Sequence, residues 1–240
     1  MSSALENPPP ARPQPQHPVQ PLENGDILTA SEFLRRFEAM PQLKKAELIE
    51  GTVYMPSAVR YTQHAKPDAI IQGWLSYYSA RTPGTEYAPN TTVRLDADDV
   101  PQPDALLRLL SECGGRTRVD AEGYLCGPPE LIVEIAASSV SIDLHAKLRS
   151  YRRASVREYL VWRTLDEQFD WFQLEQDEYR LVRPDAQGHF HSPHFPGLTL
   201  ALDALLALDA AAVLDLLQGS LQTAAHAGFV DQLRQIAGAK

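Results

Sequence analysis

The sequence predicts a mixed α/β fold, with a central mixed sheet flanked by helices and further helices at the C-terminus. Residues 131–137, LIVEIAA, alternate between two faces that are both apolar apart from one glutamate, as in a strand covered on both sides. An apolar stripe at helical spacing follows Pro67, and three strand-like runs follow one another from residue 158. Strands and amphipathic helices mixed along one chain are typical of this fold class.

The first 25 residues are predicted to be a disordered, proline-rich tail. They include NPPPARPQPQHPVQP, which offers almost nothing to bury and therefore cannot offset the entropy lost on ordering. The ordered chain is expected to begin at Thr29. There Thr-Ala-Ser-Glu has the spacing of a capping box, and Phe33, Leu34 and Phe37 fall on one helical face.

The remaining elements follow in order from their residue patterns. ELIEGTVYM is expected to contain a strand entered after a turn near Gly51, and Pro67 suits the first turn of a helix whose buried stripe ends at Tyr78. The further predicted elements are strands at 85–95 and 104–110, a loop at 111–129, a strand at 131–137, a helix at 142–154, three strands in EYLVWRT, FDWFQLEQ and EYRLVRP, a closing segment SPHFPGLTL, and helices at 203–217 and 220–237 separated by Gly219.

The composition is that of an ordinary globular protein and excludes several classes. Of 240 residues, 44% are hydrophobic and 22% are charged. The longest apolar runs are far shorter than the roughly 20 residues needed to cross a bilayer, so no membrane partner is expected. The N-terminus lacks a signal-peptide pattern, and Cys113 and Cys126 are too few for a disulfide framework or a thiolate zinc site. We therefore expect a cytoplasmic location.

Glu134 is the one charged residue in the strand at 131–137, so it is expected to be buried. Burying an ionised carboxylate costs several kcal/mol unless the group is paired or ligates a metal. Either a structural salt bridge or a functional site would satisfy it. Asp104 also opens an apolar strand, directly after Pro103, where an aspartate is often only a turn residue.

If those two strands are neighbours, the carboxylates of Asp104 and Glu134 converge. Like charges about 4 Å apart repel by roughly 4 kcal/mol at an effective dielectric of 20, and a bound divalent cation removes that cost. Hard oxygen ligands select Mg²⁺ or Mn²⁺ rather than zinc. Glu47 or Glu50, near the end of the first helix, could add a further oxygen.

Asp143, Lys147 and Tyr151 lie at i, i+4 and i+8 and so share one helical face. Lys147 either forms a surface ion pair or points back over the carboxylates, where it could orient an attacking water and stabilise charge on a phosphate. Six basic residues and two acidic ones lie between Asp143 and Arg163, although the net charge of the chain is −9. That stretch is either a solvated helix face or a surface that attracts a polyanion.

The histidines offer a rival metal site. His189, His191 and His194 form H-x-H-x-x-H, which could bind Zn²⁺ or Ni²⁺, but nothing nearby supplies an obvious fourth ligand. A solvent-exposed strand end is the alternative interpretation. His64, at a helix entry, is interpreted as a cap or packing group in preference to a phosphate contact.

These motifs together resemble the Uma-type family of putative restriction endonucleases, within the PD-(D/E)XK nuclease superfamily. The resemblance spans about residues 27–205. It rests on Asp104 after Pro103, PPELIVEIA with Glu134, the D-x-x-x-K-x-x-x-Y of 143–151, SVREYLVW, SPHFPGL, the AELIEG segment and His64. It implies a restriction-endonuclease-like domain over 26–205 and leaves a helical extension at 206–240. It also implies Asp104 and Glu134 as ligands of Mg²⁺ or Mn²⁺, and DNA as a partner contacted through residues 147–163.

The sequence departs from the family pattern at three places. One is after the later strand, where the family commonly has an acidic residue and this chain has Arg163 or Thr164. In the superfamily a lysine follows the strand glutamate by two residues, but Ala136 stands there, and Lys147 from the next helix would replace it. The chain also reads Ala137-Ser138-Ser139 where the family pattern has Ser-Pro-Ser.

Two functions therefore remain open at this stage. The first is a metal-dependent endonuclease that uses Asp104, Glu134, Lys147 and Glu47. The second is a non-catalytic binding or assembly module with a nuclease fold. A homodimer is one further option. Five apolar residues of the C-terminal helices could form a dimer seam, although packing on the core is the default expectation for them. They are Leu205, Leu206, Val213, Leu216 and Leu217.

Overall fold

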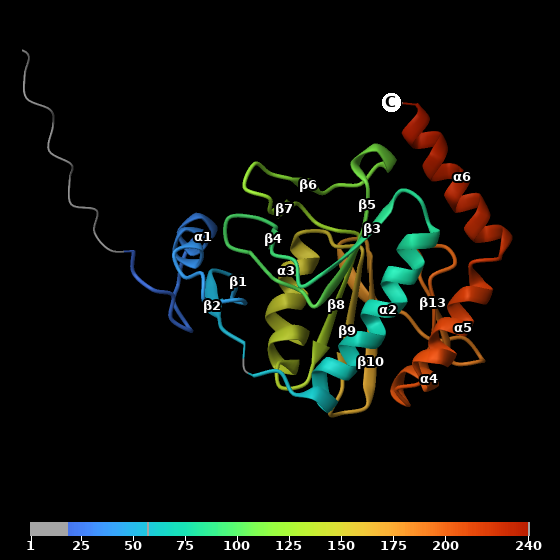
Figure 1. Ribbon diagram of the computed structural model, residues 1–240, viewed down its shortest axis with the longest axis horizontal. Coiled ribbons are helices and arrows are strands. Elements are labelled where there is room, and N and C mark those ends of the chain that lie inside the picture. Colours follow the sequence, from blue (N-terminus) through green and yellow to red (C-terminus); the bar gives the residue numbers. More distant parts are fainter. Residues whose placement is uncertain (1–18, 57, 240) are drawn as a thin grey trace, which may run out of the picture.

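The computed structural model describes residues 19–56 and 58–239. Its central element is a six-stranded sheet with strand order β11-β10-β9-β8-β5-β3 (Figure 1). β8 and β9 pair in parallel, whereas the other neighbouring pairs are antiparallel, so the sheet is mixed as the sequence predicts. The strands are β3 (Thr85–Pro89), β5 (Ala105–Leu109), β8 (Leu131–Ala136), β9 (Glu158–Arg163), β10 (Gln168–Glu175) and β11 (Glu178–Leu181).

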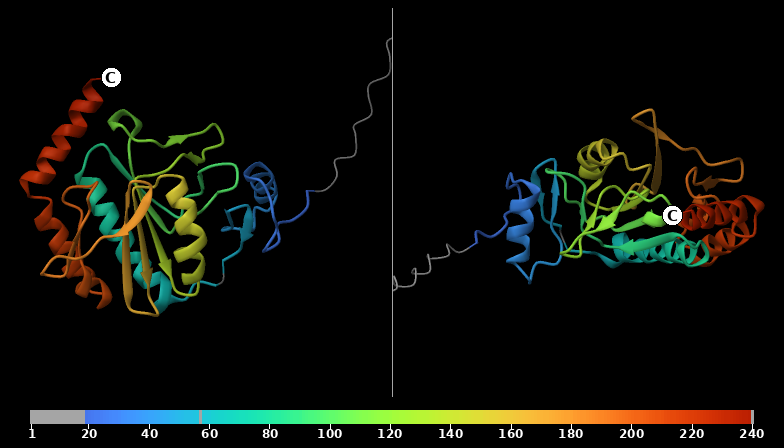
Figure 2. Two further views of the ribbon diagram at one scale, coloured as in Figure 1. Left: turned by 180° about the vertical axis from the view of Figure 1, so that it is seen from behind. Right: turned by 90° about the horizontal axis from the view of Figure 1, so that it is seen from above.

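Helices cover both faces of this sheet (Figure 2). On one face lies α2 (Lys66–Arg81), which begins with Pro67 in its first turn, as expected for a residue that needs no hydrogen-bond partner for its nitrogen. A π-helix, η1 (Tyr61–Ala65), leads into it. On the opposite face, a second π-helix, η3 (Ile142–Lys147), continues directly into α3 (Leu148–Arg153).

The alternation predicted for residues 131–137 is confirmed by the packing of β8. Leu131, Val133 and Ile135 belong to the core cluster beneath α2, together with Trp74. Ile132 and Ala136 belong to the cluster that contains Tyr151 of α3. All six residues of the strand are buried, including Glu134, so this carboxylate lies between the sheet and the second helical layer.

The N-terminal elements form a small unit at one end of the sheet (Figure 1). It comprises α1 (Ala30–Glu38) and a hairpin of β1 (Glu47–Ile49) and β2 (Thr52–Tyr54). Thr29 caps α1 by accepting a hydrogen bond from the backbone of Glu32, as its spacing predicts. The hairpin turn has positive φ at both Glu50 and Gly51, the conformation that suits a tight hairpin.

The predicted N-terminal tail falls mostly on residues 1–18, which lie outside the described residues. Within residues 19–25, however, Leu22 is buried against the cluster that contains Phe33 of α1, and the backbone of Gly25 bonds to Val53. The folded part of the chain therefore starts several residues before Thr29. The sequence does not reveal this, because Leu22 is an isolated apolar residue whose partners lie elsewhere in the sequence.

Residues 85–129 differ from the sequence-based expectation. The single strand predicted at 85–95 is two strands, since Asn90 adopts a positive φ and the chain turns away from β3. The following piece, β4 (Val93–Arg94), joins a separate three-stranded sheet. The predicted loop supplies the rest of that sheet and a short helix: η2 (Ser111–Cys113), β6 (Arg118–Val119) and β7 (Leu125–Cys126).

The C-terminal helices pack on the α2 face of the sheet (Figure 2). Gly219 is not a helix break as predicted; it lies inside α5, and the breaks occur near Leu208, which has positive φ, and at 221–223. The side chains of Leu205, Val213 and Leu217 are buried in the core, which is the default expected for them. The elements are β12 (His189–His191), β13 (Thr199–Ala201), α4 (Leu202–Leu206), α5 (Ala210–Ser220) and α6 (Ala224–Gly238). No helix among the described residues is long and apolar enough to span a bilayer.

Candidate active site

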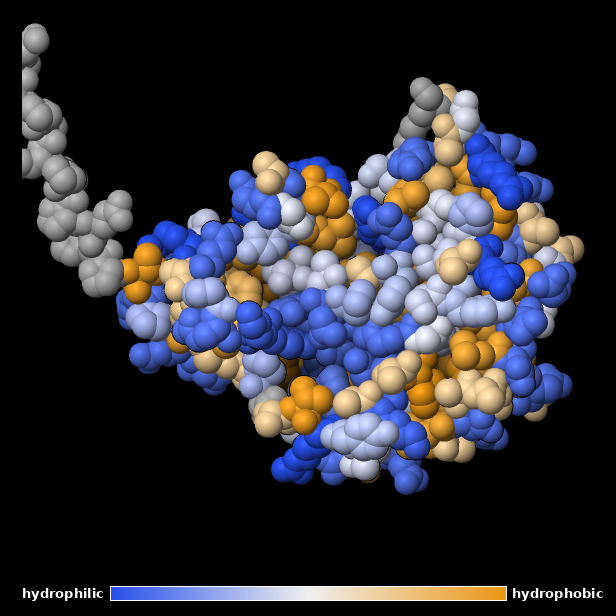
Figure 3. Space-filling model, viewed as in Figure 1, coloured by the Kyte–Doolittle hydropathy of each residue, from blue (hydrophilic) through white to orange (hydrophobic). Residues whose placement is uncertain are grey.

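A pocket of about 900 Å³ lies where the N-terminal hairpin, η1, the β5 and β8 strands and η3 meet. Figure 3 shows the surface hollowed beside the N-terminal unit, with hydrophilic residues in the hollow. The four residues that the sequence analysis selected, Asp104, Glu134, Lys147 and Glu47, all line this pocket. A smaller cavity of about 440 Å³, beside β4 and β7, contains none of them.

Lys147 is the centre of the charged network. Its ammonium nitrogen lies 2.9 Å from an oxygen of Glu134 and 2.9 Å from an oxygen of Glu47, and 3.5 Å from an oxygen of Asp143. The hydroxyl of Tyr151 donates a 2.8 Å hydrogen bond to the same Glu134 oxygen. The helical face formed by Asp143, Lys147 and Tyr151 therefore points at the sheet, not at solvent.

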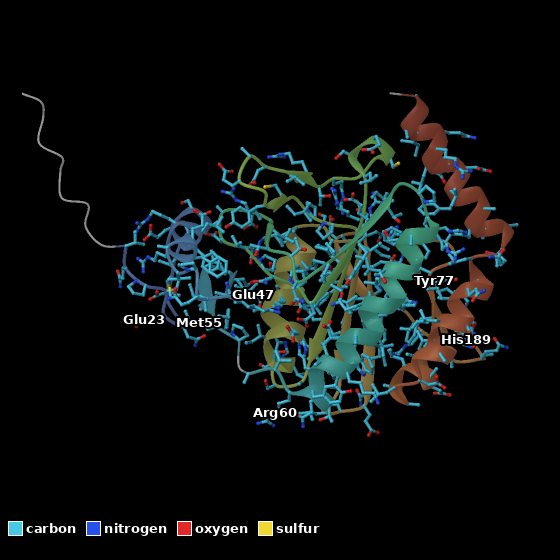
Figure 4. The ribbon with its side chains drawn as sticks, in the orientation of Figure 1. Glu23, Glu47, Met55, Arg60, Tyr77 and His189 are labelled. Carbon is cyan, nitrogen blue, oxygen red and sulfur yellow. The ribbon has the colours of Figure 1, made fainter. Side chains whose placement is uncertain are left out.

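Glu47 reaches this network from the first strand of the N-terminal hairpin. Its carboxylate accepts a 2.8 Å hydrogen bond from the backbone of Gln102 as well as the Lys147 contact. Figure 4 shows Glu47 between the N-terminal strands and the α3 helix. Glu50, the alternative acid, lies outside the pocket lining and pairs with Arg149, so Glu47 is the one that joins the site.

Asp104 is held by three donors. Its Oδ1 lies 2.9 Å from the ammonium group of Lys45, and its Oδ2 accepts a 2.8 Å bond from the backbone of Ile135, the residue after Glu134. The Nε2 of His64 lies 3.4 Å from Oδ2. The register of β5 on β8 pairs Ala105 with Val133, which places Asp104 opposite Glu134 at the end of the ladder. Because its ring contacts the Asp104 carboxylate, His64 faces the site and does not serve as a cap or packing group.

The two strand carboxylates have opposite electrostatic environments. Burial alone opposes ionisation of Asp104, but the His64 hydrogen bond and the Lys45 charge hold its pKa well below the usual value. For Glu134, burial raises the pKa, and although Lys147 counteracts this, the nearby carboxylates of Asp143, Asp104 and Glu47 raise it further. The ionised form of Glu134 is therefore disfavoured in this site, whereas that of Asp104 is favoured.

The two lysines are the cations of the site. Burial disfavours the ammonium form of Lys147, yet the surrounding carboxylates, with Glu134 the strongest, raise its pKa well above the usual value. The same opposition applies to Lys45, whose pKa is raised chiefly by Asp104 against the effect of burial. Both side chains are therefore charged, and each balances part of the carboxylate cluster.

The donor chemistry of the pocket fits a hard divalent cation. Asp104, Glu134 and Glu47 offer carboxylate oxygens, the ligands that Mg²⁺ and Mn²⁺ prefer. A bound cation would favour the ionised form of Glu134, which burial and the neighbouring carboxylates disfavour. Within residues 19–56 and 58–239, however, no three His, Cys, Asp or Glu side chains are arranged so that they hold an ion together. Ammonium groups of Lys45 and Lys147 lie among these carboxylates.

The basic stretch at 147–163 is not a free cationic surface. Lys147 is buried in the site. Four of the five arginines that follow it up to residue 163 pair with acids of other elements. The pairs are Arg149 with Glu50, Arg152 with Glu178, Arg153 with Asp99, and Arg163 with Asp170. The sequence could not reveal this pairing because the acids come from other elements. The contact surface for DNA at 147–163 stays a prediction.

The three C-terminal histidines do not form a metal cluster among the described residues. His189 and His191 lie on either side of the buried Phe190 in β12, and His191 pairs with Asp185 at 2.7 Å. His194 turns inward, where burial and the charges of Arg157 and Arg116 lower its pKa to about 4. The alternative of an exposed strand end describes His189 and His191.

Lys45 is the site residue that the sequence analysis missed. It lies two residues before Glu47 and beside Lys44, in a segment that has the composition of a solvated surface. Its partner Asp104 is 59 residues away, so no local pattern identifies the pair.

Comparisons with known proteins agree with this architecture. The chain matches the Uma2 family, described as putative restriction endonuclease, over residues 30–203, which is more than half of its length. Among solved structures it is similar to the crystal structure of a putative nuclease belonging to DUF820 from Anabaena variabilis, with 16% sequence identity and a TM-score of 0.56. The similarity covers 75% of this chain and 98% of that one, and at this identity it shows the fold alone. A search of curated proteins gave no match. On the family match, the chain belongs to the Uma2 family of putative restriction endonucleases.

Proposed function

We propose that this protein is an endonuclease that hydrolyses DNA phosphodiester bonds with Mg²⁺ or Mn²⁺. The observation that carries the proposal is the convergence of Asp104, Glu134, Glu47 and Lys147 in one pocket. A cluster of buried carboxylates around a lysine is expensive to assemble for structure alone, because each buried charge costs several kcal/mol in lost solvation. Membership of a family described as putative restriction endonucleases supports the same reaction class.

Each residue of the site has a distinct proposed role. Asp104 and Glu134 would hold the cation, and Glu47, whose carboxylate also contacts the Lys147 ammonium, would supply a further oxygen. The bound ion would act as a Lewis acid and lower the pKa of a water molecule. Lys147 orients that water through its ammonium group and stabilises the negative charge that develops on the phosphate.

The DNA backbone is proposed to approach from the open side of the pocket. His64 and Arg60 line that side, and Figure 4 shows Arg60 at the edge of the molecule. These groups are better placed than the paired arginines of 147–163. Because these groups are few and the chain carries a net charge of −9, DNA binding is expected to be weak. Its dependence on salt should be shallow, because that dependence grows with the number of phosphates contacted.

Incubation with supercoiled plasmid and Mn²⁺ tests the proposal. Wild-type protein should nick and linearise the plasmid, whereas Asp104→Ala and Glu134→Ala should be inactive. Glu50→Ala is the matched control, since it removes an acid from the same hairpin without touching the pocket, and should retain activity. Cleavage that survives both pocket substitutions would identify a contaminating nuclease and remove the basis of the proposal.

A non-catalytic binding or assembly module is the second candidate. One observation favours it: the carboxylates are already balanced by ammonium groups, which is how a purely structural ion network is built. Calorimetry separates the two functions, because a structural network should give no Mn²⁺ binding at millimolar concentrations, and an enzyme should bind the ion through Asp104 and Glu134.

A further inference from the structure

The two lysines of the site differ in their freedom to move. Lys147 contacts three carboxylates, and its side chain is only 5% exposed. Lys45 has one ion-pair partner, Asp104, and its side chain is 24% exposed on the pocket side. If the Lys147 ammonium left its position, several buried carboxylates would lose their charged partner, which is energetically costly. Lys45 can swing into the pocket and remain solvated.

Both oxygens of Asp104 have partners while Lys45 is in place, and the positive charge on Oδ1 belongs to Lys45. Oδ2 is occupied by the backbone of Ile135 and by His64, and Oδ1 is occupied by Lys45. The backbone of Ile135 is fixed in β8, so that contact is permanent. Replacing the partner of Oδ1 therefore disturbs the fold less than replacing the partners of Oδ2. A cation that binds Oδ1 must displace Lys45.

Resting on the proposed function, we propose that Lys45 is a built-in competitor for the divalent cation. Its ammonium group occupies the Asp104 oxygen when no ion is bound and leaves it for the pocket when an ion binds. After release, the Lys45 ammonium lies in the pocket through which substrate enters, where it can contact a phosphate oxygen.

The competition predicts that removing the Lys45 charge tightens ion binding. Titration of Mn²⁺ into Lys45→Met, followed by calorimetry, should give a dissociation constant on the order of tenfold lower than for the wild type, since a positive charge beside the ligand oxygen is gone. Lys45→Arg keeps the charge and should bind Mn²⁺ no more tightly than the wild type. Lys44→Met is the matched control, because the Lys44 side chain is exposed and its ammonium contacts the Pro41 carbonyl, and it should leave the affinity unchanged.

A stability measurement gives a second readout that does not depend on catalysis. Without metal, Lys45→Met should unfold at a lower temperature than the wild type, because Asp104 loses one of its partners. Mn²⁺ should raise the unfolding temperature more for Lys45→Met than for the wild type, because tighter binding stabilises the folded state more. If Lys45→Met does not fold, Lys45→Gln keeps a polar contact to Asp104 without the charge and should show the same direction of change.

The outcomes separate this inference from the proposed function. Equal or weaker Mn²⁺ binding by Lys45→Met, with a wild-type protein that binds Mn²⁺ and cleaves plasmid, would overturn the role of Lys45 and leave the nuclease function standing. Tighter binding by Lys45→Met but not by Lys44→Met supports the inference. Failure of Mn²⁺ to bind the wild type, Lys45→Met and Lys45→Arg would overturn the metal-dependent function and the inference together.

Discussion

The ammonium group of Lys147 lies 2.9 Å from Glu134, thirteen residues earlier in the chain, inside the layer between β8 and α3. Lys147→Met removes the ammonium group that contacts three buried carboxylates, so we expect the free energy of unfolding to fall by about 3 kcal/mol or more. Urea unfolding measures the loss. The double variant Glu134→Gln with Lys147→Met should lose less than the sum of the single variants, because the two residues interact directly. Strict additivity would contradict the network.

The hydroxyl of Tyr151 donates to the Glu134 carboxylate, whereas the hydroxyl of Tyr159 donates to the backbone carbonyl of Asp143. Each Tyr→Phe variant loses one buried hydrogen bond, which costs about 1 kcal/mol. Only Tyr151→Phe alters a proposed metal ligand, so it should also weaken Mn²⁺ binding and slow plasmid cleavage. Equal activity losses in Tyr151→Phe and Tyr159→Phe would show that the carboxylate contact has no special role.

Glu158 gives a prediction about pH that is independent of the candidate site. Burial raises its pKa to about 7, against hydrogen bonds from Ser192 and Trp171 that favour the ionised form. The folded state therefore holds the Glu158 proton more tightly than the unfolded chain. The stability that this proton contributes is complete below the unfolded pKa near 4.5 and is lost as the pH rises through 7.

Comparison with Glu158→Gln isolates this effect, because glutamine does not titrate. The free energy of unfolding of the wild type, minus that of Glu158→Gln, should fall by up to roughly 3 kcal/mol between about pH 5 and about pH 8. Glu112→Gln, at an exposed position, controls for the loss of one carboxylate. A difference between wild type and Glu158→Gln that does not change with pH would contradict the assignment.

Leu217 and Leu216 are neighbours in α5 with different surroundings. Leu217 is fully buried in the core cluster beneath α2, and Leu216 is only partly buried. Leu217→Ala should lower the free energy of unfolding by about 3 kcal/mol through loss of packing, and Leu216→Ala by clearly less. Thermal or urea unfolding of the two variants distinguishes core packing from a dimer seam, which would instead make the loss depend on protein concentration.

The sequence was sufficient to predict the parts of the fold that depend on short-range patterns. The alternation of residues 131–137, the proline at the start of α2 and the cap at Thr29 each determine a local element, and the structure confirms all three. The position of Leu22 and the helix break near Leu208 were missed. Leu22 is buried by residues that are distant in the sequence. Leu208 adopts a positive φ, which is uncommon for leucine and therefore not predicted from its residue type.

The candidate site likewise contains residues that the sequence identifies and residues that it does not. Glu134 stands out because a lone charge in an apolar strand has to be satisfied, and Asp104 and Lys147 follow from their spacing and the family likeness. Lys45 could not be found, since a lysine next to another lysine before a short strand has no local signature. The pairing of Arg149 and Arg153 with acids from other segments was hidden for the same reason: it depends on tertiary contacts.

An anomalous difference map from crystals of the protein soaked in Mn²⁺ tests the central claim most directly. The account predicts one strong peak in contact with carboxylate oxygens of both Asp104 and Glu134, with the Lys147 ammonium still beside Glu134. The peak should vanish in crystals of Asp104→Asn. Mn²⁺ bound elsewhere, for example beside His189 and His191, with none between Asp104 and Glu134, would contradict the account.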